Sequence, residues 1–288
     1  MVLSKAKMTP FTFINSVLLL GVAFVTIYPF LHMIAVSLSG DVHVMRGDVN
    51  LIPKELTFKN YEHVLSDSRI GTGYFNTILY VTLGTAISLI ITAMGAYALS
   101  KKTMIFRKGF MIMIVFTILF GGGMIPTFLV VKSLGLLDTV WAMVLPQAVS
   151  TWNLIIMRTF FSATIPNELE ESAKIDGLND LGIFARIVLP LSKPVLATIG
   201  LFYAVGIWNN FILPLLYLRD DALYPLQVIL RNLVLVEQMA DVSGGDAVVV
   251  QESIQYATIL VSTLPILLLY PFLQKYFVKG VMIGSLKE

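Results

Sequence analysis

The feature that most constrains this chain is its long stretches without Asp, Glu, Lys or Arg. Six of them stand out, and each is close to or above the roughly 20 residues that a helix needs to cross about 30 Å of hydrocarbon. Only 13% of the residues are charged, against about 25% in a soluble domain, so lipid is the natural solvent for this chain. The stretches run from Met8 to Gly40, Ile70 to Ser100, Gly109 to Val131, Thr139 to Met157, Pro194 to Leu218, and Ser253 to Gln274.

These stretches are continuously apolar, whereas the strands of a membrane barrel alternate between apolar and polar residues. We therefore predict an all-α integral membrane protein with six transmembrane helices. The first stretch is too long for the apolar core of a signal peptide. The predicted spans are residues 11–38, 74–99, 109–131, 139–158, 194–218 and 253–274, with an N-terminus at 1–10, an extracytoplasmic loop at 39–72, a cytoplasmic loop at 159–193, an outer loop at 219–252 and a tail at 275–288.

The distribution of basic residues predicts the orientation of the spans. With the N-terminus inside, the inner segments hold 13 of the 20 Lys and Arg residues. Residues 101–108 alone carry four cations and no anion. Because basic residues accumulate on the cytoplasmic side, we predict that both termini face the cytoplasm.

The third stretch contains Gly121-Gly122-Gly123 followed by Pro126, a combination that weakens a helix. A bent helix that lines a pathway is one reading. Close packing of helices through small residues is the other, and it is the one that we favour from the sequence.

The cytoplasmic loop at 159–193 has the composition of an ordered segment. Pro166 suits the first turn of a helix, acidic residues follow it, and Gly177 can end that helix. We predict a second short helix from Asn179 or Asp180 to about Val188, ended by Leu189-Pro190.

One face of the first loop helix is small or apolar, as in helices that dock into a groove of a partner. A helix on lipid headgroups is the alternative, but such helices favour Lys and Arg. The face consists of Leu169, Ser172, Ala173 and Asp176.

The same loop resembles the EAA signature of ABC-importer permeases, which is written E-A-A-x3-G-x9-I-x-L-P. The match is Glu171-Ser172-Ala173-x3-Gly177-x9-Ile187-x-Leu189-Pro190, with serine in place of the second-position alanine. Over nearly its whole length the chain resembles the carbohydrate-uptake, maltose-permease-like branch, and its tail is most similar to oligo- and polysaccharide importers. Further matching stretches are Gly135–Thr139, Trp208–Phe211 and Gln274–Gly280.

The resemblance implies a type I ABC importer permease domain at residues 73–277, in a bacterial inner membrane. It implies a second homologous permease subunit, two cytoplasmic ATP-binding subunits and an extracytoplasmic solute-binding protein as partners, with a sugar as the substrate. The loop would then form coupling helices in a cleft of the ATPase. Glu171 would contact the ATPase, and Gly177 would permit the turn between the helices.

No catalytic, metal or cofactor site is predicted. The chain lacks cysteine and a G-x-x-x-x-G-K-[ST] phosphate loop, and the net charge of +2 does not indicate nucleic acid. His32, His43 and His63 do not have metal-ligand spacing, and His32 reads as a packing residue. An ion-coupled carrier or an intramembrane enzyme is the alternative function, but both favour ionisable residues within the spans, and no Asp or Glu lies in any of them.

Polar and aromatic residues within the spans are candidates for the sugar pathway. Aromatic rings cover the C–H faces of sugars, and amides pair with their hydroxyl groups. Interface belts and contacts between helices are the alternative roles of such residues. The candidates are Trp152, Asn153, Tyr203, Trp208, Asn209 and Asn210.

Overall fold

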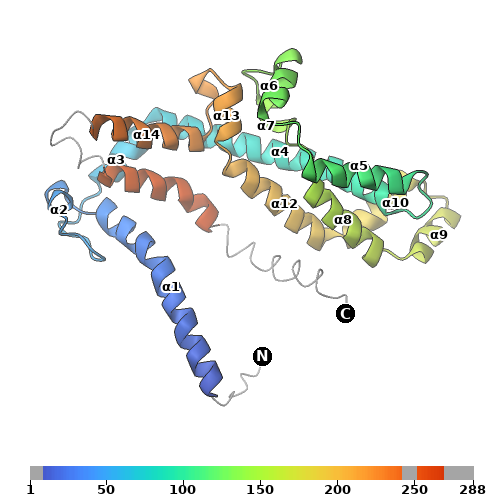
Figure 1. Cartoon of the computed structure of the whole chain (residues 1–288), viewed down its shortest axis with the longest axis horizontal. Coiled ribbons are helices and arrows are strands. Elements are labelled where there is room, and N and C mark those ends of the chain that lie inside the picture. Colours follow the sequence, from blue (N-terminus) through green and yellow to red (C-terminus); the bar gives the residue numbers. More distant parts are fainter. Residues whose placement is uncertain (1–8, 242–251, 269–288) are drawn as a thin grey trace. The chain divides into compact units, whose positions relative to one another are not determined.

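The computed structural model describes residues 9–241 and 252–268, and the regular structure in these ranges is helical (Figure 1). The basic N-terminus, the tail at 275–288 and the end of the sixth predicted span lie outside the described residues. In chain order the helices are α1 (Pro10–Ser37), α2 (Asp41–Met45), α3 (Lys59–Ser66), α4 (Ser68–Ser100), α5 (Arg107–Leu119), α6 (Met124–Ser133), α7 (Val140–Val144), α8 (Thr151–Thr164), α9 (Asn167–Ile175), α10 (Asp180–Ile183), the π-helix η1 (Phe184–Val188), α11 (Leu189–Leu191), α12 (Lys193–Trp208), α13 (Ile212–Tyr217), the 3-10 helix η2 (Asp221–Leu223) and α14 (Leu226–Asp241), followed by a helix at Glu252–Leu268.

The chain divides into two compact units. The first comprises Met1–Ser68 with Leu230–Leu264, and the second comprises Arg69–Ile229 with Pro265–Glu288. The second unit holds the loop at 159–193 and all six candidate pathway residues.

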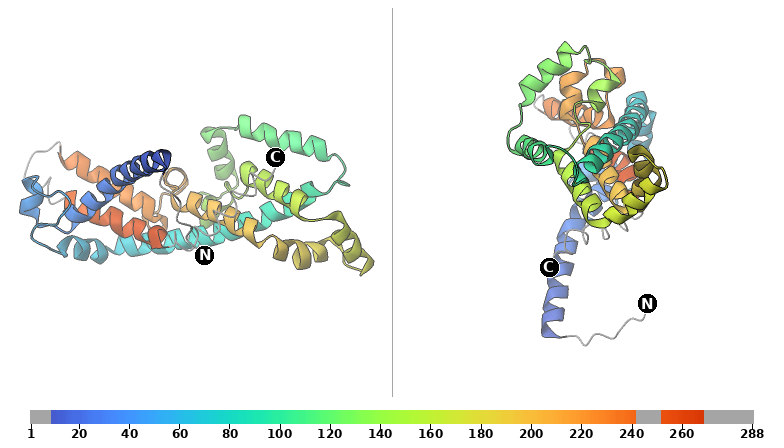
Figure 2. Two further views of the ribbon diagram at one scale, coloured as in Figure 1. Left: turned by 90° about the horizontal axis from the view of Figure 1, so that it is seen from below. Right: turned by 90° about the vertical axis from the view of Figure 1, so that its right-hand side faces the viewer.

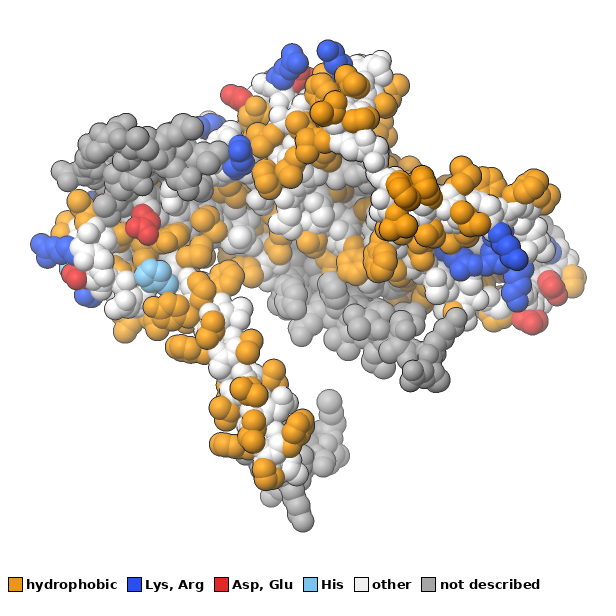
Figure 3. Space-filling view, viewed as in Figure 1, with side chains coloured by type: hydrophobic (Ala, Val, Ile, Leu, Met, Phe, Trp, Pro, Cys, Tyr) orange, Lys and Arg blue, Asp and Glu red, His pale blue; other side chains and the backbone are white. Residues whose placement is uncertain are grey.

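In the first unit, α1 begins at a Thr9 cap and presents apolar side chains along most of its length (Figure 3). Only its last turn is buried, at Ala35, Val36 and Ser37. A long helix with exposed apolar side chains is suited to lipid or to a partner helix. His32 fits the packing role, because its Nδ1 lies 2.8 Å from the carbonyl oxygen of Asn50.

In the second unit, α4 passes through two separate hydrophobic clusters. Tyr80 belongs to one cluster, and Ala96 and Tyr97 belong to the other. Because these positions are 16 residues apart in one helix with a rise of about 1.5 Å per residue, α4 is a continuous rod between two packing centres.

The third predicted span is not one straight helix. α5 and α6 meet at an angle of 113°, with the glycines between them. Gly123 has a φ of +84°, and a Cβ at Gly121 or Gly122 would meet no atom within 4 Å. Within this chain, these glycines therefore break the helix and do not allow close packing of helices. Close packing was the interpretation favoured from the sequence.

Two other predicted spans are also divided. Between α7 and α8 the chain leaves the helix at residues 145–150, which include Pro146. Between α12 and α13 it does so at Asn209, Asn210 and Phe211. Among the described residues, two helices are long and apolar enough to cross a membrane alone, and up to four spans result if each bent pair is counted as one. The number of six spans stays a prediction.

Candidate coupling loop and pathway residues

The loop at 159–193, predicted to be cytoplasmic, folds into two short helices joined by a tight turn at Gly177. α9 starts directly after Pro166 and carries acidic residues in its first turn, where they complement the helix dipole. The φ of Gly177 is +85°, a left-handed conformation that disfavours residues with a Cβ. The N–H of Leu178 donates to the carbonyl of Ala173 at 3.0 Å, which closes the end of α9.

The second helix starts as predicted but ends later. The side-chain oxygen of Asn179 accepts a hydrogen bond from the N–H of Gly182 at 2.8 Å and caps α10. The prediction that Leu189-Pro190 ends this helix is wrong, because the chain continues through η1 and α11 to Leu191. The wider turn of the π-helix accommodates Pro190, which has no N–H to donate.

The residues of the signature motif divide between a buried anchor and an exposed surface. Ala173 is buried in the cluster that contains Ala96 and Tyr97. The Ser172 hydroxyl bonds within α9, to the carbonyl of Glu168 at 2.9 Å. Of the other motif positions, Glu171, Gly177 and Pro190 are exposed together with Ser172, whereas Ile187 and Leu189 are half-buried.

Two apolar side chains of this loop are strongly exposed. Ile175 at the end of α9 is 87% exposed, and Leu181 in α10 is 68% exposed. They lie outside the predicted spans, so lipid does not account for their exposure, and both are candidates for contact with a partner protein. The sequence analysis missed both, although an isoleucine directly before Asp176 and Gly177 in a polar stretch was a usable signal.

Two ion pairs hold the loop, and they differ in burial. Lys101, directly after α4, pairs with Glu170 of α9, and these side chains are 18% and 14% exposed. Lys174 and Asp180 pair across the turn at 3.3 Å and are 55% and 68% exposed. Figures 1 and 2 show α9 and α10 beside the C-terminal end of α4, where the first pair lies, and Figure 3 shows basic side chains gathered there.

The candidate pathway residues do not form one surface. The Tyr203 hydroxyl lies 2.7 Å from the Thr92 hydroxyl and accepts from the N–H of Ser150 at 2.9 Å, so it joins α12 to α4 and to the cap of α8. Asn153 and Trp208 are buried, whereas Trp152 is 65% exposed and Asn209 is exposed. Tyr203 therefore has a structural role in this conformation.

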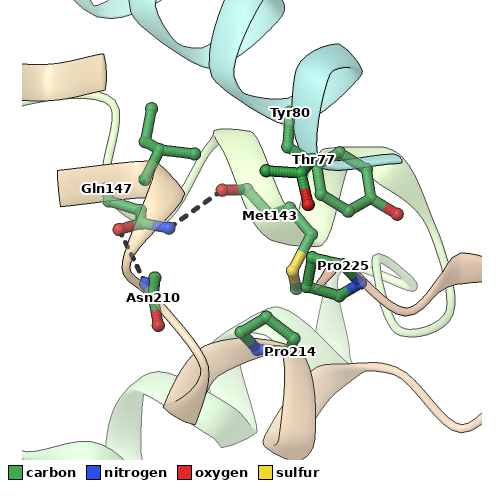
Figure 4. A pocket seen from close by; sticks show the side chains of 8 residues that line it. Thr77, Tyr80, Met143, Gln147, Asn210, Pro214 and Pro225 are labelled. Carbon is green, nitrogen blue, oxygen red and sulfur yellow. Dashed lines mark hydrogen bonds between the residues drawn. The ribbon is translucent and has the colours of Figure 1, made fainter. Parts of the chain in front are cut away.

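Asn210 is the candidate that lines a pocket, and the pocket is small (Figure 4). Its amide nitrogen donates to Gln147 Oε1 at 3.1 Å, and Gln147 Nε2 donates to the carbonyl of Met143 at 3.1 Å. The cavity of about 10 Å³ has room for about one water molecule, so this pocket cannot hold a sugar ring in this conformation. The sequence analysis missed Thr77, Tyr80 and Gln147, which also line the pocket.

No group of three or more His, Asp or Glu side chains in the described ranges could hold a metal ion.

The family model described as "binding-protein-dependent transport system inner membrane component" matches residues 7–283. The chain is 47% identical over 273 residues to the polygalacturonan/rhamnogalacturonan transport system permease protein YtcP of Bacillus subtilis, covering 93% of this chain and 95% of that protein. It is 29% identical over 271 residues to the arabinooligosaccharides transport system permease protein AraQ of Halalkalibacterium halodurans, covering 92% of this chain and 93% of that protein.

A solved structure is also similar. A chain from a bacterial ABC transporter involved in the import of the acidic polysaccharide alginate has a TM-score of 0.87 and 36% identity, covering 95% of this chain and 100% of that chain.

Proposed function

The chain belongs to the family of binding-protein-dependent transport system inner membrane components, and on this premise we propose that it forms one half of the membrane pathway of an ABC importer for oligo- or polysaccharides. It is a non-catalytic, integral inner membrane permease subunit. The names of its relatives include polygalacturonan, arabinooligosaccharides and alginate, and they support a saccharide of several units as the substrate.

The loop α9–α10 is the proposed contact with the ATPase subunits. The observation that carries this proposal is the exposure of Ile175, Leu181 and Glu171 on an ordered elbow outside the predicted spans. An apolar centre flanked by charge is the composition of a protein interface. Two ATP-binding subunits would each receive one such elbow, one from this chain and one from a homologous second permease subunit.

Replacing Ile175 with aspartate tests this contact. We expect the amount of ATPase subunit that co-purifies with the solubilised complex to fall about fivefold, because a charge then faces an apolar contact. The matched control is Ile52→Asp. Ile52 is also strongly exposed, at 78%, but lies in the segment predicted to face outward. Equal co-purification with Ile175→Asp and with the unmodified chain would contradict the proposed contact.

The proposed orientation places the loop in the cytoplasm and residues 39–72 outside. The chain has no cysteine, so a single introduced cysteine reports one position. We expect Ser172→Cys to react with a membrane-impermeant maleimide in inverted vesicles and not in intact spheroplasts. The exposed Ser66 of α3, as Ser66→Cys, should behave in the opposite way. Labelling of Ser172→Cys from the outside would overturn the orientation and the ATPase contact.

The apolar faces of the described helices accommodate the remaining partners. α5 has no buried residue, and α1 is exposed over most of its length; these helices are proposed to meet lipid or the second permease subunit. An extracytoplasmic solute-binding protein would deliver the sugar to the outer face. The proposal excludes the ion-coupled carrier, which would transport sugar as a lone subunit without ATP.

A further inference from the structure

The coupling helix α9 is tied to the end of α4 by a shielded ion pair. Lys101 Nζ bonds to Glu170 Oε2 and lies 4.2 Å from the centre of the Tyr97 ring. Lys101 thus has an anion on one side and an aromatic face on the other, which is a favourable setting for an ammonium group.

This pair differs in kind from the other pair of the loop. Lys174 and Asp180 are more than half exposed, and water screens such surface pairs so that they contribute little. Lys101 and Glu170 are both less than one-fifth exposed, and removal of one partner would leave the other charge poorly solvated. Removing one partner of this pair therefore costs more than removing one partner of the surface pair.

Glu170 and Ala173 form the inner face of α9. They are three residues apart and thus lie on the same side of the helix. Ala173 is buried in the same cluster as Tyr97, so both inner residues meet the end of α4. The opposite side carries the exposed Glu171 and Ile175, which are proposed to meet the ATPase.

In its N-terminal half, α4 is bonded to the segment that follows α13. The Tyr80 hydroxyl donates to the carbonyl of Leu223 at 2.8 Å. The N–H of Leu226 donates to the Thr77 hydroxyl at 2.9 Å. α4 is one uninterrupted helix of 33 residues, so a displacement applied at Lys101 reaches these contacts without crossing a helix break.

We propose that the Lys101–Glu170 pair, seated on the Tyr97 ring, is the joint that transmits movement of the coupling helix to α4. The two charged residues act as positioning residues for transport. The proposal rests on the proposed function, because it takes the outer side of α9 as the ATPase contact.

The experiment measures sugar uptake and ATP hydrolysis by the full complex in proteoliposomes, together with co-purification of the ATPase subunits. We expect Lys101→Ala and Glu170→Ala each to lower the number of sugars transported per ATP about fivefold, with the ATPase subunits still bound. The double variant should lose little more than either single variant, because both remove the same contact. The exchanged pair Lys101→Glu with Glu170→Lys should recover most of the lost transport.

Lys102→Ala is the matched control, since it removes the same charge from the exposed neighbouring position; we expect transport per ATP to stay within about twofold. Three results would each contradict the proposed role of the Lys101–Glu170 pair: additive losses in the double variant, no recovery in the exchanged pair, or an equal loss with Lys102→Ala. A failure of the proposed function is distinguishable, because Ile175→Asp would then leave the bound ATPase unchanged whatever the Lys101 variants do.

Discussion

Replacing Gly177 with valine is expected to lower ATP-driven sugar uptake by the full complex at least tenfold, while the chain still inserts into the membrane. The φ of Gly177 is +85°, and a non-glycine residue held in a sparsely populated conformation loses roughly 1–3 kcal/mol. A β-branched residue is the least tolerant of positive φ. The strain is relieved if the turn opens, which changes the angle between α9 and α10 and disturbs the contact that we propose they make with the ATPase.

A series of substitutions at Gly177 tests whether backbone strain, and not a steric clash of the new side chain, causes the loss of uptake. A Cβ at Gly177 would meet no atom within 4 Å, so a steric clash with the rest of the chain does not contribute. Asparagine tolerates the left-handed region better than other non-glycine residues. We therefore expect uptake to decrease in the order Gly177→Asn, Gly177→Ala, Gly177→Val.

The matched control for this series is Gly109→Val. Gly109 is a glycine of α5 that also has free space around its Cβ position but does not have a positive φ. The measurements are uptake in proteoliposomes and the amount of complex purified from membranes. Full uptake with Gly177→Val, or an equal loss with Gly109→Val, would refute the role of the turn.

The elbow could be predicted from the sequence because its determinants are local. Acidic residues after Pro166, a glycine at the end of the helix and an asparagine cap each act within one turn. The continuation through Pro190 could not be predicted, because it depends on the π-helical hydrogen bond from the N–H of Leu189 to the carbonyl of Phe184, for which the sequence has no local signal.

The breaks within the predicted spans were missed for a different reason. Hydropathy reports the transfer of side chains into lipid, whereas a helix break depends on which backbone groups find other partners. The segment at 145–150 remains apolar enough to continue the stretch, although the helix stops there. At Asn209-Asn210 the amides gave a polar signal, which the sequence analysis interpreted as a candidate sugar contact or a contact between helices, and not as the end of α12.

The roles of the pathway candidates could not be predicted, because they depend on hydrogen-bond partners far away in the sequence. The sequence identifies aromatic and amide groups within a span, but not whether their polar atoms already have partners. Tyr203 is engaged by Thr92 and Ser150, and Asn210 by Gln147. Those partners are distant in the sequence, so only the structure distinguishes a bonding role within the chain from a free sugar contact.

Asn210 and Gln147 lie at two helix breaks. Among the polar contacts of the pathway candidates, we expect the contact between these two amides to be the most sensitive to substitution. Asn210 donates to Gln147 and, through Oδ1, accepts from the N–H of Leu213 at 3.2 Å at the start of α13. Gln147 in turn donates to Met143 of α7. The chain of hydrogen bonds thus ties the break after α12 to the break after α7.

We expect Asn210→Leu to lower the thermal midpoint of the purified complex by roughly 2–12 °C. The variant leaves the Gln147 oxygen and the N–H of Leu213 without their partner, and an unpaired buried polar group is worth about 1–3 kcal/mol, where 1 kcal/mol corresponds to about 2–4 °C for a chain of this size class. Gln147→Leu should have a smaller effect, because the capping contact to Leu213 survives.

The double variant decides between a bond within the chain and a sugar contact. With both amides replaced by leucine, no orphaned partner remains between them, so the loss should be smaller than the sum of the two single losses. Asn209→Leu is the matched control, because the exposed Asn209 amide bonds only to the carbonyl of Val205 within its own helix among the contacts described, and it should leave the midpoint nearly unchanged. A sugar-contact role for Asn210 makes the opposite prediction: the midpoint without sugar is retained, and the sugar concentration needed for half-maximal uptake rises. That result would refute a structural tie between the two helix breaks.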